Sequence, residues 1–333
     1  MQFCLDAAGT RHGNGDKGGQ MGRAFIFPGQ GSQAVGMGRE LAEAFAPARY
    51  VFEEVDDALE QRLSRLMFEG PGEELILTRN AQPALMAVSL AALRVIEQEG
   101  GIDLPDKADF VAGHSLGEYS ALAAAGTFAV ADSARLLRLR GQAMQEAVPV
   151  GQGAMVALLG LDLEAVRALA EEAADDQICT PANDNAPGQV VVSGDAAAVE
   201  RAAALAGERG AKRSVMLPVS APFHCPLMAP AADVMAEALD RITLRPPRVP
   251  VVTNVTATAT SEPDTLRRLL VQQVTALVRW RESVLYMKEQ GVDTMVEIGA
   301  GRVLTGLTRR IDREITGLSA GTPAEIEALL KIL

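Results

Sequence analysis

Short apolar runs and longer amphipathic stretches alternate along most of this chain. The apolar runs at residues 24–27, 110–112, 249–254 and 294–298 predict strands. Helical spacing of apolar residues predicts helices at 81–98, 118–126, 130–147, 264–277 and 282–290. Strands that alternate with helices in this way indicate a parallel sheet covered by helices on both faces.

Residues 151–219 follow a different pattern. Strands are predicted at 154–159, 177–182, 189–193 and 212–217, and helices at 163–174 and 196–210. The resulting order, β-α-β-β-α-β, is that of a ferredoxin-like module. The alternating pattern resumes afterwards, so we expect an inserted subdomain at 151–218 and a main domain formed by 23–150 and 219–333.

The first 22 residues are Gly-rich and polar and show no periodicity. They lack the apolar core of a signal peptide, and their aspartates fit a transit peptide poorly. We expect residues 1–22 to form a disordered leader.

Composition narrows the class of protein. Across 333 residues the hydrophobic content is 48%, which suits a well-buried α/β enzyme, and the net charge of −12 argues against a general nucleic-acid surface. No apolar run approaches the roughly 20 residues of a membrane span. The three cysteines, Cys4, Cys179 and Cys225, lie far apart and form no disulfide-like or metal-like pattern. The cysteine pattern therefore favours a cytoplasmic protein without a metal site. We also expect a monomer without a cofactor, a state that the composition does not itself determine.

The pentapeptide Gly113-His114-Ser115-Leu116-Gly117 has the form of a nucleophile elbow. It joins a predicted strand to a predicted helix, so its serine hydroxyl is expected to be exposed beside free backbone N–H groups. The flanking glycines allow the strand and the helix to approach closely. Ser115 is therefore the candidate nucleophile.

A second G-x-S-x-G match surrounds Ser319. Thr322 and Pro323 predict that the next helix begins several residues after this serine, whereas an elbow requires the helix to begin at the serine. We expect Ser319 to have no catalytic role.

A serine nucleophile needs a general base, which is usually a histidine. His12 lies in the expected leader, and His114 is adjacent to Ser115, where neighbouring side chains point in different directions. His224 remains, in a proline-flanked segment, either as the base or as an ordinary loop histidine. Its neighbour Cys225 is expected to be a buried structural thiol.

Arg140 lies on the apolar stripe of its predicted helix, together with Leu137, Gly141 and Met144, whereas Arg135 and Arg138 fall on the opposite side. A guanidinium that points inward needs an acceptor. That acceptor is either an internal carboxylate in a salt bridge or the carboxylate of a ligand held beside the nucleophile.

Two glycine-rich turns follow predicted strands. Around Gln30, a backbone N–H is available to complement that of Leu116 in an oxyanion hole, although a tight strand-to-helix connection would need the same glycines. The turn at Gly299 and Gly301 lacks the third glycine of a dinucleotide fingerprint, so nucleotide binding there is disfavoured.

Taken together, these motifs resemble the malonyl-CoA:acyl-carrier-protein transacylase family of bacterial type II fatty-acid synthesis. The resemblance runs from about Arg23 to Ile311. Its motifs are Phe27-Pro28-Gly29-Gln30-Gly31-Ser32-Gln33, Gln82-Pro83-Ala84, Gly113-His114-Ser115-Leu116-Gly117-Glu118-Tyr119, Arg140-Gly141, Asn185-Ala186-Pro187-Gly188-Gln189, Ala221-Pro222-Phe223-His224, and Gly299 with Val303-Leu304-Thr305-Gly306-Leu307.

The resemblance implies an α/β-hydrolase-like core with a ferredoxin-like insert and the active site between them. It also implies the following roles: Ser115 as nucleophile, His224 as base, Arg140 as the ligand of the malonate carboxylate, the N–H groups of Gln30 and Leu116 as oxyanion hole, and Gln82, Met144, Asn185 and Phe223 as pocket residues. A backbone carbonyl near Arg279 and Trp280 is expected to orient the histidine.

The implied reaction is transfer of a malonyl group from malonyl-CoA to the phosphopantetheine thiol of acyl carrier protein, through a malonyl-serine intermediate. We expect an exposed basic patch at Arg309, Arg310 and Arg313 to meet the carrier protein. Two rival interpretations remain: a thioesterase or esterase that uses water as acceptor, and a non-catalytic scaffold subunit that keeps the fold.

Overall fold

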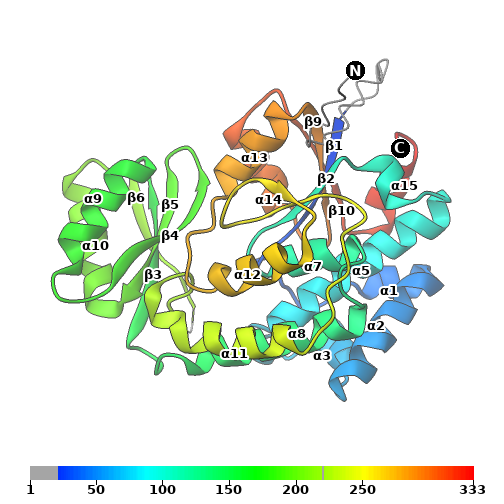
Figure 1. Ribbon diagram of the computed structural model, residues 1–333, viewed down its shortest axis with the longest axis horizontal. Coiled ribbons are helices and arrows are strands. Elements are labelled where there is room, and N and C mark those ends of the chain that lie inside the picture. Colours follow the sequence, from blue (N-terminus) through cyan, green and yellow to red (C-terminus); the bar gives the residue numbers. More distant parts are fainter. Residues whose placement is uncertain (1–21, 220) are drawn as a thin grey trace, which may run out of the picture.

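The computed structural model describes residues 22–219 and 221–333 (Figure 1). Apart from Gly22, which begins the first strand, the expected leader lies outside the described residues, and so do His12 and Cys4. No helix in the described ranges is both long enough and apolar enough to cross a membrane.

A six-stranded sheet forms the centre of the larger domain, in the order β10-β9-β1-β2-β7-β8. All neighbouring strands are parallel except β8, which is antiparallel to β7. Their bounds are β1 Gly22–Phe27, β2 Phe110–Gly113, β7 Val251–Val252, β8 Ala259–Thr260, β9 Val292–Ile298 and β10 Thr316–Ala320. The parallel core predicted from the alternating pattern is thus confirmed.

Both faces of this sheet are buried, which explains the continuous apolar runs of its strands. On β1, Phe25 and Phe27 belong to one apolar cluster with the helices that follow it, whereas Ala24 and Ile26 belong to a second cluster that contains Trp280. The helices of this domain are α1 Arg39–Ala44, α2 Ala46–Leu59, α3 Leu63–Glu69, α4 Gly72–Leu75, α5 Thr78–Gly100, α6 Leu104–Lys107, α7 Leu116–Ala124, α8 Val130–Glu146, α11 Ala229–Asp240, α12 Pro263–Gln273, α13 Trp280–Glu289, α14 Val303–Ile311 and α15 Pro323–Leu330, with a 3₁₀ turn at Pro226–Met228.

The residues between α8 and α11 form a smaller antiparallel sheet, shown in green at the left of Figure 1, in the order β4-β5-β3-β6. Its elements are β3 Gly153–Leu159, α9 Leu163–Ala174, β4 Cys179–Ala186, β5 Gln189–Asp195, α10 Ala196–Glu208 and β6 Arg213–Met216. This order is the predicted β-α-β-β-α-β. On β3, Val156 and Leu158 pack with α9 and α10, while Met155 faces the core of the larger domain.

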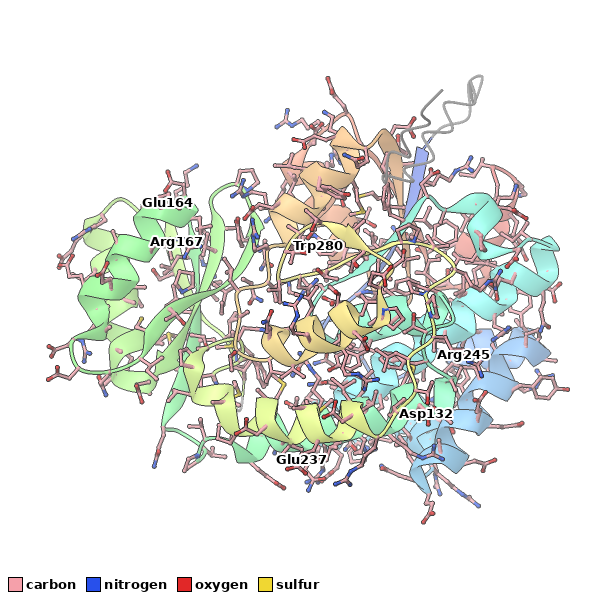
Figure 2. The ribbon with its side chains drawn as sticks, viewed as in Figure 1. Asp132, Glu164, Arg167, Glu237, Arg245 and Trp280 are labelled. Atoms are coloured by element: carbon pink, nitrogen blue, oxygen red, sulfur yellow. The ribbon has the colours of Figure 1, made fainter. Side chains whose placement is uncertain are left out.

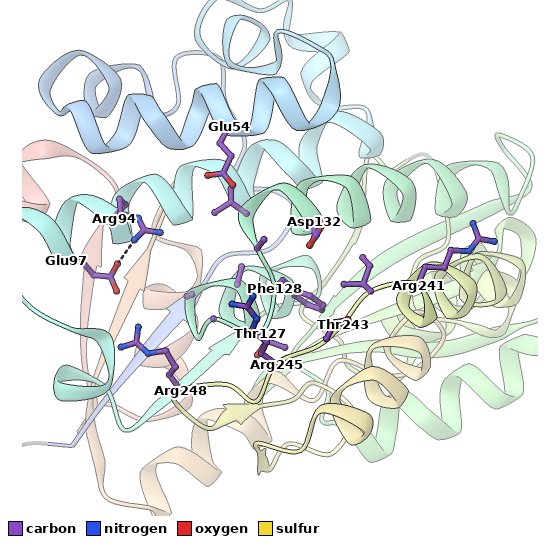
Figure 3. A pocket seen from close by; sticks show the side chains of 16 residues that line it. Glu54, Arg94, Glu97, Thr127, Phe128, Asp132, Arg241, Thr243, Arg245 and Arg248 are labelled. Atoms are coloured by element: carbon purple, nitrogen blue, oxygen red, sulfur yellow. Dashed lines mark ion pairs between the residues drawn. The ribbon is translucent and has the colours of Figure 1, made fainter.

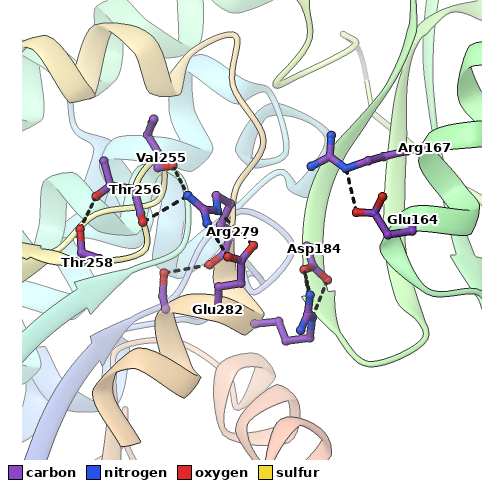
Figure 4. A network of polar contacts seen from close by, with 10 residues as sticks. Glu164, Arg167, Asp184, Val255, Thr256, Thr258, Arg279 and Glu282 are labelled. Atoms are coloured by element: carbon purple, nitrogen blue, oxygen red, sulfur yellow. Dashed lines mark hydrogen bonds and ion pairs between the residues drawn. The ribbon is translucent and has the colours of Figure 1, made fainter. Parts of the chain in front are cut away.

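The smaller sheet is fastened to the larger domain along β4. Backbone bonds join Asp184 N–H to the Val278 carbonyl and Val278 N–H to the Ala182 carbonyl, both at 2.9 Å. Arg281 Nε donates to both oxygens of the buried Asp184 carboxylate, at 3.1 and 3.0 Å (Figure 4). The edge of the subdomain next to the elbow is therefore held at fixed register.

Charged side chains cover the outside of the molecule, as Glu164 and Arg167 on α9 and Glu237 on α11 illustrate (Figure 2). Trp280, by contrast, lies fully buried and begins α13. The segregation of charge from apolar bulk is that expected for a packed core on both sides of a sheet.

Two elements differ from the sequence prediction in ways that matter for function. The strand predicted at 249–254 is reduced to Val251–Val252, and the helix predicted at 264–277 ends at Gln273. Val274 and Thr275 follow this end, and β-branched residues are poor helix formers. The early end leaves the Gln273 carbonyl without a partner inside its own helix.

Close packing of β1, β2 and α7 depends on two glycines. A Cβ on Gly113 would lie 1.9 Å from the Gly117 carbonyl oxygen, and one on Gly117 would lie 2.2 Å from the Phe27 carbonyl oxygen. Neither position has room for a side chain, because the obstructing atoms belong to the backbone.

Gly117→Ala is therefore expected to lower the free energy of unfolding by about 1–3 kcal/mol, the usual effect of overpacking a tight core. Gly207→Ala is the matched control, because that helical glycine of α10 has no atom within 4 Å of an added Cβ; it should be neutral or stabilising by about 0.5–1 kcal/mol. Chemical denaturation measures both, and equal stability of the two variants would contradict this packing.

Candidate active site

Ser115 lies at a sharp turn between the end of β2 and the start of α7. Its backbone has φ 52° and ψ −110°, a conformation that a residue with a side chain rarely adopts. The turn is held by Asn254, whose Oδ1 accepts the Ser115 backbone N–H at 2.7 Å and whose Nδ2 donates to the Gly113 carbonyl at 2.7 Å. Strain of this kind persists only where the surroundings fix it, and here it presents the hydroxyl to a cavity.

His224 comes from the loop before α11 and reaches the same point. Its Nε2 lies 2.8 Å from Ser115 Oγ, and its Nδ1 lies 2.9 Å from the Gln273 carbonyl oxygen. A carbonyl only accepts, so Nδ1 carries the proton and Nε2 is left as the acceptor for the serine hydroxyl. Of the two histidines in the described ranges, His114 and His224, it is His224 whose side chain contacts the nucleophile.

The imidazole of His224 is held neutral. Burial, together with the neighbouring Arg140 charge, lowers its pKa from 6.5 to about 3, and the bond to the Gln273 carbonyl opposes this shift only in part. A neutral imidazole with a free Nε2 is the form that accepts a proton from a serine.

The carbonyl that orients His224 is that of Gln273, so the prediction of a position near Arg279 and Trp280 is wrong. Helix α12 ends at Gln273, and the last carbonyls of a helix have no intrahelical partner. Arg279 instead donates its N–H to the Asn254 carbonyl at 3.0 Å and its side chain to Glu282 (Figure 4).

Arg140 is buried and points at the nucleophile. Its Nη2 donates to Ser115 Oγ at 3.1 Å and to Gln273 Oε1 at 3.0 Å, and its Nη1 donates to Gln82 Oε1 at 2.9 Å. The guanidinium carbon of Arg140 lies over the ring of Tyr119, 5.6 Å from the centre of that ring. No carboxylate pairs with Arg140 within the described part of the chain, so the internal salt bridge considered from the sequence is absent there.

The stripe that carries Arg140 packs as predicted, with Leu137, Gly141 and Met144 also buried. A Cβ on Gly141 would lie 2.5 Å from the Thr78 carbonyl oxygen, so this glycine brings α8 directly against α5 and places Arg140 within reach of Gln82. Arg135 is exposed as expected, but Arg138 is half-buried.

A cavity of about 360 Å³ opens beside Ser115 and His224. Gln82, Met144 and Phe223 line it, together with Gln30 and Leu116. Asn183 lines it as well, whereas Asn185 does not. Asn185 instead accepts a hydrogen bond from His114 Nε2 at 2.8 Å, so the predicted pocket role of Asn185 is not supported.

Gln30 and Leu116 bring two backbone N–H groups to this cavity. Neither N–H has an acceptor among the described residues. The loop around Gln30 lies close against the elbow, since a Cβ on Gly29 would be 2.7 Å from the His114 carbonyl oxygen. Two unengaged donors beside a nucleophile are what an oxyanion hole requires.

Other candidate residues are engaged elsewhere. Cys225 is buried, its Sγ donates to the Pro222 carbonyl at 3.1 Å, and burial raises the pKa of its thiol. Ser319 lies within β10 and donates a hydrogen bond to Glu325, so it is not at a strand-to-helix elbow. Arg309, Arg310 and Arg313 are exposed at the end of α14 but do not line the cavity, so a carrier-protein patch there stays a prediction.

A larger cleft of about 750 Å³ lies elsewhere on the molecule (Figure 3). Arg94 is paired with Glu97 at 3.6 Å, and Arg248 with Asp103, and none of the predicted site residues lines this cleft. Within the described ranges, no group of three or more His, Cys, Asp or Glu side chains is arranged to hold a metal ion. The reactive groups converge on the smaller cavity.

Gln273 and Asn254 are the functional residues that the sequence did not reveal. Gln273 is an ordinary glutamine near the end of an amphipathic helix, and nothing in the sequence marks it. Asn254 had a usable signal, because it follows the strand beside β2, and the carboxyl ends of parallel strands meet at one edge of the sheet.

Comparison with known proteins supplies the last observation. The family described as "Acyl transferase domain" matches residues 24–321. A malonyl CoA-acyl carrier protein transacylase of Escherichia coli strain K12 is 48% identical over 310 residues, covering 93% of this chain and 99% of the relative.

Two solved structures are similar over nearly their whole length. An acyl-carrier-protein S-malonyltransferase from Bartonella henselae has a TM-score of 0.92 and 57% identity, with 94% of this chain and 99% of that chain covered. A malonyl-transacylase in complex with a type II PKS acyl-carrier protein has a TM-score of 0.91 and 45% identity, with 94% of this chain and 100% of that chain covered.

The depressed pKa of His224 makes a prediction about reactivity. Covalent labelling of Ser115 by a fluorophosphonate probe should stay at its full rate from about pH 8 down to about pH 5, because the imidazole remains neutral far below the usual histidine range. Labelling rates across this range measure it, with His224→Ala as the unreactive control. A half-maximal rate near pH 6.5 would contradict the account.

Proposed function

We propose that this chain, which belongs to the malonyl CoA-acyl carrier protein transacylase family, transfers a malonyl group from malonyl-CoA to the phosphopantetheine thiol of an acyl carrier protein. The product supplies chain-extender units for fatty-acid synthesis. The match to the acyl transferase family, the near-complete coverage of named transacylases and a relative solved with a carrier protein support this proposal.

One observation carries the proposal most directly. Arg140 is fully buried, has only neutral acceptors within the described residues, and lies at hydrogen-bond distance from Ser115 Oγ. A buried guanidinium without a carboxylate partner favours an anionic ligand, and a carboxylate accepts from it in bidentate fashion. The malonyl group offers such a carboxylate two bonds away from the reacting carbonyl.

In the first half-reaction, His224 Nε2 takes the proton of Ser115, and the serine Oγ attacks the thioester carbonyl. The N–H groups of Gln30 and Leu116 stabilise the negative oxygen of the tetrahedral intermediate. The C–S bond then breaks, the sulfur of CoA receives the proton from the imidazolium, and a malonyl-serine ester remains. The Gln273 carbonyl keeps the imidazole oriented throughout.

In the second half-reaction, the phosphopantetheine thiol gives its proton to His224 and its sulfur attacks the ester. Ser115 leaves with the proton from the imidazolium, which restores the enzyme. CoA departs before the carrier protein enters, so the kinetics are ping-pong. The same base and the same oxyanion donors serve both halves.

The residues that line the cavity limit the size of the acyl group that it accepts. Phe223, Met144 and the aliphatic part of Gln82 are buried around the cavity and leave little room for a branched acyl group. Hydrolysis of a thioester by water does not require a site that binds a free carboxylate of the acyl group. A thioesterase would therefore not need Arg140 beside its nucleophile. The complete set of reacting groups also disfavours a purely structural subunit.

The cellular setting and domain limits belong to the same proposal. We assign the main domain to residues 23–150 and 219–333, to which the first strand adds Gly22, and the subdomain to 151–218. Two unpaired, buried cysteines, Cys179 and Cys225, support a reducing, cytoplasmic setting. We propose that the enzyme acts as a monomer.

Ser115→Ala should abolish formation of the acyl-enzyme, because Ser115 is the one nucleophile among the described residues that is hydrogen-bonded to the His224 imidazole. Intact-mass analysis after mixing with malonyl-CoA measures the adduct, and addition of holo carrier protein should then discharge it from the wild-type enzyme. A malonyl adduct that persists in the variant would refute the assignment.

Arg140→Ala should cost about 1.5–3 kcal/mol in the acylation barrier for malonyl-CoA, the usual worth of a hydrogen bond to a charged group. Acetyl-CoA lacks the free carboxylate of malonyl-CoA and should be affected much less, so the preference shifts towards acetyl-CoA. Arg135→Ala is the matched control, since Arg135 lies on the same helix with its side chain 58% exposed. Unchanged selectivity in Arg140→Ala would show that the guanidinium is only structural.

A further inference from the structure

Glu118 is a fully buried carboxylic acid beside the active site for which the reaction above has no use. It lies in the first turn of α7, three residues after the nucleophile. Its Oε2 accepts the backbone N–H of Asn254 at 2.8 Å and the side-chain Nε2 of Gln273 at 2.9 Å. Both partners belong to the frame that holds the catalytic groups.

The amide of Gln273 needs to be held in one of its two orientations. Its Nε2 faces three oxygen acceptors, which are Glu118 Oε2, the Ser115 carbonyl at 3.0 Å and Asn254 Oδ1 at 3.1 Å. Its Oε1 faces Arg140 Nη2 at 3.0 Å. A reversed amide would turn its NH₂ group towards the guanidinium, so that two donors would face each other in a buried site.

We propose that Glu118 is a positioning residue of the acyl-transfer site. Its carboxyl group fixes the orientation of the Gln273 side-chain amide, so that Gln273 Oε1 accepts the hydrogen bond from Arg140. This inference rests on the proposed function, because it concerns how Arg140 is aimed at the malonyl carboxylate. Glu118 acts on the substrate only through Gln273 and Arg140.

The contacts of Glu118 distinguish this positioning role from that of a reacting group and from that of a counter-ion of Arg140. In the described structure it has no hydrogen bond or ion pair to Ser115 Oγ, His224 or Arg140, so it touches none of the reacting groups. Its second oxygen, Oε1, has no partner there either. Burial raises the pKa of Glu118 to about 7, so at neutral pH it is not a permanent counter-ion of Arg140. A proton on Oε1 leaves Oε2 free to accept both bonds.

The test compares acylation rates with malonyl-CoA and with acetyl-CoA, both followed by intact mass. Glu118→Leu removes the acceptor and should lower the malonyl rate by about 10- to 100-fold more than the acetyl rate, because a buried charged group loses an oriented partner. Glu118→Gln keeps an acceptor oxygen at the same place and should retain the wild-type ratio. A general loss of folding would instead lower both rates alike.

A double-variant cycle isolates the path through Gln273. Gln273→Met removes the side-chain amide but keeps the backbone carbonyl that orients His224. If Glu118 acts through that amide, adding Glu118→Leu to Gln273→Met should cost little more malonyl selectivity than Gln273→Met alone. Fully additive losses would overturn the proposal.

Glu297→Leu is the control for losing a buried carboxylate. Glu297 is equally buried but accepts N–H groups at the start of α14, away from the cavity lining, so this variant should lose stability and keep the malonyl-to-acetyl ratio. A wild-type protein that forms no malonyl adduct would refute the proposed function itself. A wild-type adduct with an unchanged ratio in Glu118→Leu, or with Glu118→Gln as impaired as Glu118→Leu, would overturn this inference alone.

Discussion

The site depends on the Arg140 guanidinium, which is buried without an ion-pair partner among the described residues. Removing a charged group from water is costly unless hydrogen bonds replace its hydration. Arg140 receives that replacement from Gln82, Gln273 and the Ser115 hydroxyl, with the face of Tyr119 beneath it. All of these partners are neutral, so the charge remains available to a substrate carboxylate, and the surrounding helices have to be held closely enough to keep the partners in place.

The fold supplies that closeness through backbone contacts and local strain. Glycines at the elbow and on α8 allow strand, helix and loop to approach at distances that no side chain would permit. Ser115 and His224 both have positive φ, at 52° and 58°, and the same polar frame of Asn254 and Gln273 holds both. Strained backbone at a reactive site requires such support from its surroundings. The subdomain completes the cavity, with β4 fixed by its bonds to Val278 and Arg281.

Much of this arrangement was accessible from the sequence, because local patterns determine it. Apolar runs predicted the parallel sheet and the inserted module, and the inward stripe of α8 predicted the burial of Arg140. The polar frame was not accessible, because Gln273 acts through a helix that ends four residues earlier than its periodicity suggests. The position near Arg279 came from the family resemblance and not from the periodicity, and the structure gives the orienting role to the Gln273 carbonyl instead. The bond of Asn185 to His114 was hidden for a similar reason, since it depends on how one domain packs on the other.

The most direct test of the central claim is a crystal structure of the malonyl-enzyme. The account predicts a malonyl ester on Ser115 whose free carboxylate lies within hydrogen-bond distance of the Arg140 guanidinium. The carbonyl oxygen of this ester should lie near the N–H groups of Gln30 and Leu116. A carboxylate directed to the cavity mouth, with Arg140 still bound only to glutamine side chains, would contradict it.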